Sequence, residues 1–273
     1  MIYRKTAAFL LYLAAVSAFA AESPKLSADQ TSVLEDARAY ALQYAEQLPN
    51  FICTQITRRE ISRNHHVSGA YGIGITSTEN INHDLIEEQL TYLGGKESYK
   101  VLTVNGKQAP GLVHMQIGGA ISTGEFGTIF TQVFSPDSHT NFTWDHETSV
   151  HGHRAWSFKY RVPRESGAAV IDRETNTAVI APFSGKVLID PDTFAVLEIS
   201  STLELPANFR IRNVERRILY AEQNIAGKNY DLPIHCEIHM QEGDLIFDNS
   251  IDFQNYHRFS SESTIHVGDS VQQ

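Results

Sequence analysis

Apolar and polar residues alternate along much of this chain with a period of two. The alternation is clearest in four segments, at 155–162, 195–205, 234–241 and 245–253. In the first segment Trp156, Phe158 and Tyr160 alternate with Ser157 and Lys159. Successive side chains of a strand point to opposite faces of a sheet, so each segment has one apolar and one polar face. This pattern is typical of an antiparallel sheet that is solvated on one side.

Turn-forming residues lie between the alternating segments. Asp190-Pro191-Asp192-Thr193 separates two predicted strands, and residues 226–229 (Ala-Gly-Lys-Asn) separate two others. Asp, Pro, Gly and Asn favour tight turns through their side-chain hydrogen bonds or their backbone preferences. Both stretches therefore predict hairpins, which join antiparallel strands.

Helical spacing replaces the two-residue period near the N-terminus. Ser27 and Gln30 match a capping box, in which the side chain of each residue accepts a hydrogen bond from the backbone amide of the other residue. Apolar residues then recur at steps of three and four up to Leu48, where Pro49 follows. We expect a helix between Ser27 and Leu48.

A second helix is expected within the sheet. Ser122 and Glu125 repeat the capping-box spacing ahead of an apolar stripe that contains Phe126 and Phe130. Pro136 ends this stripe. The chain is therefore expected to be mainly β, in the α+β class. It contains no internal repeat or proline-rich linker, so residues 21–273 are expected to form one domain.

The first 20 residues have the features of a cleavable signal peptide. Arg4 and Lys5 precede an apolar run at 7–16, and Ala18-Phe19-Ala20 matches the small-x-small cleavage pattern. The apolar run is shorter than the roughly 20 residues that span a bilayer. We therefore expect an exported, soluble protein, periplasmic or secreted, with no membrane span.

The net charge restricts the partners. The full chain carries −10, and loss of Arg4 and Lys5 with the signal peptide makes it more negative. Nucleic acid and anionic lipid headgroups are repelled by such a charge, so neither is an expected partner.

Cys53 and Cys236 are the only cysteines. Export places them where disulfides persist, so a Cys53–Cys236 bridge is a candidate. The alternative is two buried thiols, because a bridge requires Cα atoms about 5.5 Å apart.

Two patterns raise the question of catalysis. His235, Glu237 and His239 share one strand face, and two imidazoles with a carboxylate can begin a metal site. Ser122 lies in a degenerate form of the G-x-S-x-G nucleophile motif, although an N-cap serine explains it equally well. A hydrolase or metal enzyme is therefore one hypothesis, but no cofactor is expected.

The order of elements resembles a known fold. After the first helix come the segment LPNFICTQ, a long antiparallel run, the inserted helix and then the hairpin SGKVLIDPDTFAVLEI. This layout is similar to the lipoprotein-carrier fold of LolA, LolB and the RseB sensor domain. LPNFICTQ and GGAISTGEFGTIF also resemble phrases in a set of exported bacterial proteins without an assigned function.

The resemblance implies a curved antiparallel sheet, or half-barrel, whose open side is covered by the N-terminal helix and the inserted helix. It also implies a non-enzymatic carrier for lipid, lipoprotein acyl chains or another apolar small molecule, bound between sheet and helix. The residues expected to line this cavity are Phe126, Phe130, Trp156, Phe158, Ile238, Met240 and Phe247. The alternative is an envelope module that binds another protein and has no ligand cavity.

Overall fold

The computed structural model describes residues 25–68, 74–121 and 123–259. The expected signal peptide at 1–20 and the candidate nucleophile Ser122 lie outside these ranges. Two α-helices, thirteen strands and three short 3-10 helices make up the described chain. The α-helices are α1 (Ala28–Gln47) and α2 (Thr128–Phe134), and the 3-10 helices are η1 (His114–Gln116), η2 (Pro136–Ser138) and η3 (Arg164–Ser166).

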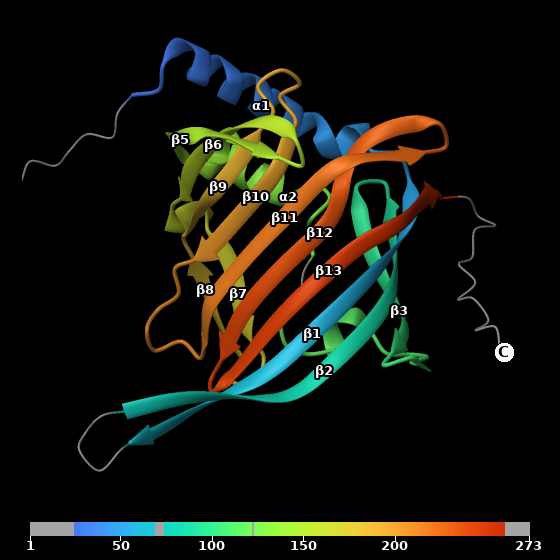
Figure 1. The fold of residues 1–273 in the computed structure, drawn as a ribbon, viewed down its shortest axis with the longest axis vertical. Helices are drawn as coiled ribbons and strands as arrows, with labels where there is room; N and C mark the ends of the chain where they lie inside the picture. The colour runs from blue at the N-terminus through green and yellow to red at the C-terminus, as the bar shows by residue number, and fades with distance from the viewer. Residues whose placement is uncertain (1–24, 69–73, 122, 260–273) are drawn as a thin grey trace, which may run out of the picture.

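Eleven strands form one open, antiparallel, curved sheet (Figure 1). Its order is β4-β3-β2-β1-β13-β12-β11-β10-β9-β6-β5, so the first long strand pairs with the last. The bounds are β1 Phe51–Ser68, β2 Gly74–Leu93, β3 Lys96–Val104, β4 Lys107–Gln108, β5 Asn141–Val150, β6 His153–Val162, β9 Phe183–Ile189, β10 Val196–Leu203, β11 Ile211–Ile225, β12 Lys228–Glu242 and β13 Leu245–Arg258. The expected mainly antiparallel fold with helices is confirmed.

Both predicted hairpins are present. The Asp190 carboxylate accepts hydrogen bonds from the backbone amides of Asp192 and Thr193, at 2.8 and 3.1 Å, and so closes the turn between β9 and β10. Ala226 and Gly227 have φ angles of 52° and 86° in the turn between β11 and β12. Positive φ at both central positions gives a backbone twist that matches the twist of the flanking strands.

Helix α1 lies across one end of the sheet (Figure 1). Its predicted capping box is confirmed, since Ser27 Oγ accepts from the Gln30 amide at 3.2 Å and Gln30 Oε1 accepts from the Ser27 amide at 2.9 Å. The helix buries Leu34, Ala37 and Tyr44 against the rest of the core.

The predicted start of the second helix is wrong. Helix α2 begins at Thr128, after Gly127 as N-cap, so Glu125 and Phe126 precede it. Gly124 and Gly127 have φ angles of 90° and 124°, which no α-helix accommodates. Residues 124–127 instead form a non-helical segment that enters the core.

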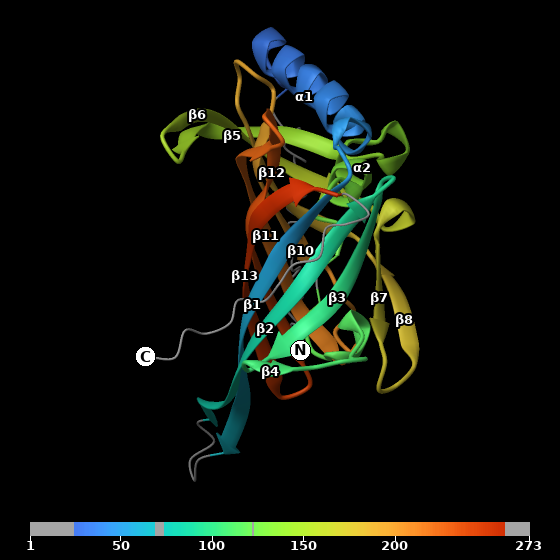
Figure 2. The ribbon, with the colours of Figure 1, turned by 90° about the vertical axis from the view of Figure 1, so that its right-hand side faces the viewer.

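The concave side of the sheet is covered by α2 and by a separate hairpin (Figure 2). Its strands are β7 (Ala168–Asp172) and β8 (Thr177–Ala181). The two-residue period does not predict this hairpin, because apolar residues occupy both alternating sets of its positions.

The predicted disulfide is wrong. Cys53 and Cys236 are both buried, but they lie in β1 and β12, which β13 separates. Cys236 is opposite Ile251, whereas the neighbours of Cys53 are opposite Gln254 and His257. Two strand spacings and an offset of four to five residues place the Cα atoms roughly 17 Å apart, beyond the roughly 7 Å limit of a disulfide.

Candidate binding groove on the outer face of the sheet

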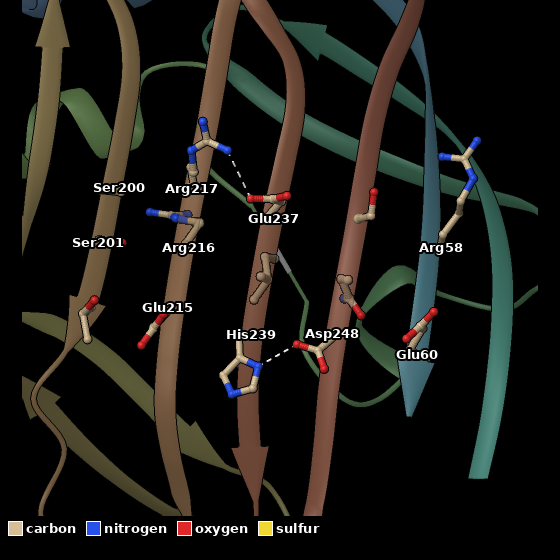
Figure 3. Close-up of a pocket in the computed structure, with 14 residues that line it drawn as sticks. Arg58, Glu60, Ser200, Ser201, Glu215, Arg216, Arg217, Glu237, His239 and Asp248 are labelled. Atoms are coloured by element: carbon tan, nitrogen blue, oxygen red, sulfur yellow. Dashed lines mark hydrogen bonds and ion pairs between the residues drawn. The ribbon is translucent and has the colours of Figure 1, made fainter. Parts of the chain in front are cut away.

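A groove of about 620 Å³ lies on the outer face of the sheet (Figure 3). Five adjacent strands, β1, β13, β12, β11 and β10, supply its lining. The neighbours Arg59 and Asn249 point to the opposite, concave side, where both donate hydrogen bonds to the Ala120 carbonyl. The fourteen lining residues are Arg58, Glu60, Ser200, Ser201, Thr202, Glu215, Arg216, Arg217, Glu237, Ile238, His239, Asp248, Asn249 and Ser250.

Strand register aligns the outward-facing side chains of the groove in two parallel rows. Members of a row are direct cross-strand partners, so they lie about 4.5–5.5 Å apart. The rows are two residues, or about 7 Å, apart along the strands. The acidic row consists of Glu60, Asp248, His239, Glu215 and Thr202, and the arginine row consists of Arg58, Ser250, Glu237, Arg217 and Ser200.

The arginine row is neutralised by carboxylates. Arg217 makes a bidentate pair with Glu198, at 2.8 and 2.9 Å, and reaches Glu237 at 3.4 Å. These hydrogen bonds to Glu198 raise the pKa of Arg217. Arg58 donates to Asp252, which also contacts His235. Burial opposes ionisation of Asp252, but its hydrogen bonds with His235 and Arg58 lower its pKa overall.

The acidic row has fewer counter-charges. His239 Nδ1 lies 2.6 Å from Asp248 Oδ1, and Figure 3 shows this pair at the centre of the groove. Among the described residues, Glu60 forms an ion pair only with His83, at 4.0 Å. Glu215 makes no ion pair or side-chain hydrogen bond with any residue that the structure describes. The row therefore presents carboxylates that a cationic ligand can pair with.

The proposed metal ligands His235, Glu237 and His239 do share this outer face. However, His235 Nδ1 lies 2.7 Å from Asp252, while His239 contacts Asp248, so each imidazole has its own carboxylate. Within residues 25–68, 74–121 and 123–259, no group of three or more histidine, cysteine or acidic side chains is arranged to hold a metal ion.

The residues predicted to line an apolar cavity are placed on the concave side, except that Ile238 also borders the outer groove through its strand. Phe126 packs against Phe51 and Phe253, with ring centroids 5.2 and 5.6 Å apart. Phe130 packs against Tyr44 and Tyr220 at 4.9 and 5.0 Å. Phe158, Ile238 and Phe247 are buried in the same core, and Trp156 and Met240 are half-buried against it. These side chains fill the space around one another.

A polar cluster that the sequence pattern does not predict lies on the concave side. Glu88 is 1 % exposed and contacts His114 at 2.8 Å and Gln55 at 3.2 Å. Tyr99 stacks on His114 with ring centroids 4.2 Å apart. The alternation pattern assigns such residues to the inner face, but it does not reveal that polar side chains far apart in the sequence meet there.

Glu125 is fully buried at the edge of this cluster. Its carboxylate oxygens have no hydrogen-bond partner in the described chain, and Arg216 Nη1 lies 3.8 Å from Oε1. Burial raises the pKa of the Glu125 carboxyl to about 7, against the opposing charge of Arg216, and Glu97 adds to the increase. The sequence pattern predicts Glu125 as a helix-capping residue, whereas in the structure it is a buried carboxyl.

No protein-family model and no curated protein matches the chain. Several solved structures are similar to it at low sequence identity. A DUF1329 family protein from Desulfovibrio piger has 10% identity and a TM-score of 0.33, over 85% of this chain and 95% of that one. A putative outer membrane lipoprotein-sorting protein domain from Vibrio parahaemolyticus has 9% identity and a TM-score of 0.34, over 85% of this chain and 92% of that one.

A LolA superfamily protein from Nitrosomonas europaea has 10% identity and a TM-score of 0.28, over 84% of this chain and 93% of that one. The fold described above rests on the strand order and register of the chain itself. No helix in its described residues is long and apolar enough to cross a bilayer.

Proposed function

We propose that this protein is an exported, non-enzymatic binding protein that binds another polypeptide through the outer-face groove. One contrast carries the proposal. The concave side, where an apolar ligand was expected, is filled by the protein's own aromatic side chains, whereas the outer face has a groove of about 620 Å³. Charged groups arranged on a protein surface favour partners of complementary charge.

The apolar-carrier hypothesis requires a rearrangement. Phe126 and Phe130 occupy the space between α2 and the sheet, and Gly127 brings α2 close to Ala45 of α1. An acyl chain would have to displace residues 124–134 to reach the apolar face of the sheet. Losing the contacts of two buried phenylalanines costs several kcal/mol, at about 3–5 kcal/mol for each ring.

Two measurements on the mature protein separate these functions. In the first, a photo-crosslinking amino acid replaces Ser250, which lies in the arginine row, and Glu35 on α1 is the control position. The proposal expects one discrete adduct from position 250 and none from position 35. The captured protein is then identified and must bind the purified chain without crosslinking.

The second measurement is native mass spectrometry of protein purified from the periplasm, with organic extraction of anything bound. The proposal expects the bare mass and no uptake of a fatty acyl probe. Extracted lipid, together with no adduct at position 250, would overturn the proposal and support the apolar carrier.

A further inference from the structure

Resting on the proposed function, we infer that the bound polypeptide is a cationic, extended segment of the partner, whose lysine or arginine side chains pair with the acidic row. The row places Glu60, Asp248 and Glu215 on one exposed face. Asp248 and Glu215 are separated along the row by His239, the only basic side chain in it.

The charge is not balanced within the groove. Arg58 and Arg217 lie in the neighbouring row, but their hydrogen bonds go to Asp252, Glu198 and Glu237 rather than to the acidic row. The remaining cation of the lining, Arg216, contacts the Thr123 carbonyl and Glu125 on the concave side. Glu60 and Glu215 therefore keep their negative charge exposed at the two sides of the groove.

The geometry suits an extended chain that crosses the strands. Glu60 and Glu215 are three strand spacings apart, or about 15 Å at roughly 5 Å per spacing. Alternate side chains of an extended peptide lie about 7 Å apart on one face, so three of them span about 14 Å. Two or three cationic side chains at alternate positions can therefore reach the carboxylates of the row together.

The net charge of the whole chain also favours a cationic partner. The chain carries a net charge of −10, which attracts a cationic segment over long distances and repels an acidic one. At the groove, cationic side chains can pair with Glu215, which has no ion pair among the described residues, and with Glu60, whose ion-pair partner is His83 at 4.0 Å. A segment of the opposite sign would have to compete with Glu198 and Asp252 for the two arginines, which are already paired.

The test uses a defined probe with the intact mature protein. The probe is a labelled eight-residue peptide in which lysine alternates with threonine and both ends are capped, and the matched control peptide has glutamate in place of lysine. Binding is followed by fluorescence polarisation at low and moderate salt. The test variants are Glu60→Gln, Glu215→Gln and their combination, and Glu35→Gln on α1 is the control with the same change in net charge.

We expect the lysine peptide to bind and the glutamate peptide not to bind. Each single test variant should weaken binding by roughly 2–5-fold and the double variant more, because exposed ion pairs contribute little individually. Binding should also weaken as salt rises, because salt screens these charges. Glu35→Gln should bind like the unmodified protein.

Three results would overturn the inference: no binding of the lysine peptide, equal binding of the double variant, or an equal loss in Glu35→Gln. The last result would indicate attraction to the net charge and not to the row. If the inference fails while position 250 still captures a protein, the partner is not cationic and the proposed function survives. If neither experiment detects binding, both proposals fail.

Discussion

Arg216 Nη1 and Glu125 Oε1 face each other at 3.8 Å on the concave side of the sheet, where the carboxylate accepts no hydrogen bond from any described residue. Arg216 also donates to the Thr123 carbonyl at 3.3 Å, so its side chain contacts Glu125 in the non-helical segment 124–127 and a residue just before that segment. Because both groups lie next to the aromatic core, the protonation state of Glu125 affects how stably that segment packs.

Stability should therefore decrease as pH rises from about 5 to 8. The pKa of Glu125 is about 7 in the folded protein and 4.5 as the ordinary value, so the folded state favours the protonated form. This contribution is complete below the unfolded pKa and is lost as pH rises through the folded pKa. The side chain in Glu125→Gln cannot ionise, so the variant does not lose this contribution as pH rises. It should be more stable than the parent at pH 8 by on the order of 3 kcal/mol.

Urea unfolding of the parent and the variant at pH 5.5 and pH 8 measures this difference. Glu35→Gln, on the exposed side of α1, should retain the pH dependence of the parent. An equal pH dependence in Glu125→Gln would show that another group is responsible.

Gly127→Ala should destabilise the protein, because Gly127 lies where α2 packs against α1. Gly127 has a φ angle of 124°, and a Cβ there would lie 2.9 Å from Ala45 Cβ. Backbone strain alone costs roughly 1–3 kcal/mol at such a position, and the close contact adds to it. Thermal unfolding should show a clear decrease in Tm. Gly152→Ala is the matched control: its φ angle is also positive, at 85°, but nothing lies within 4 Å. An equal loss in both variants would contradict the role of the close contact.

Phe130→Ala distinguishes a core residue from a ligand-contacting one. The Phe130 ring is 0 % exposed and packs between Tyr44 and Tyr220. We expect the free energy of unfolding to fall by about 3–5 kcal/mol, as for other buried phenylalanines. Met240→Ala, at a half-buried position of the same core, should cost less. A small loss in Phe130→Ala, with loss of bound lipid, would instead support a ligand cavity at α2.

The two cysteines should remain thiols in the folded protein. Alkylation of the denatured, unreduced protein should modify both Cys53 and Cys236, as measured by mass spectrometry. In the folded protein Cys53 should react slowly, because burial raises its pKa and covers the sulfur. A protein that is alkylated only after reduction would show that a disulfide forms and that the strand register is different.

The local elements of this protein follow from its sequence. The two-residue alternation identified the strands around Phe158 and Ile251, and the Ser27–Gln30 capping box identified the start of α1. Asp190 and Gly227 marked two hairpins because the preferences that form a turn act within a few residues. Such short-range patterns were sufficient for the fold class.

Only the tertiary structure decided where these elements meet. Glu60, Glu215 and Asp248 lie in one row because of strand register, which joins the first long strand to the last. Glu125 matched a capping pattern, yet two positive-φ glycines and the packing of α2 on α1 made it a buried carboxyl. Cross-strand position, burial and pKa depend on contacts between residues far apart in the chain, and no local pattern encodes those contacts.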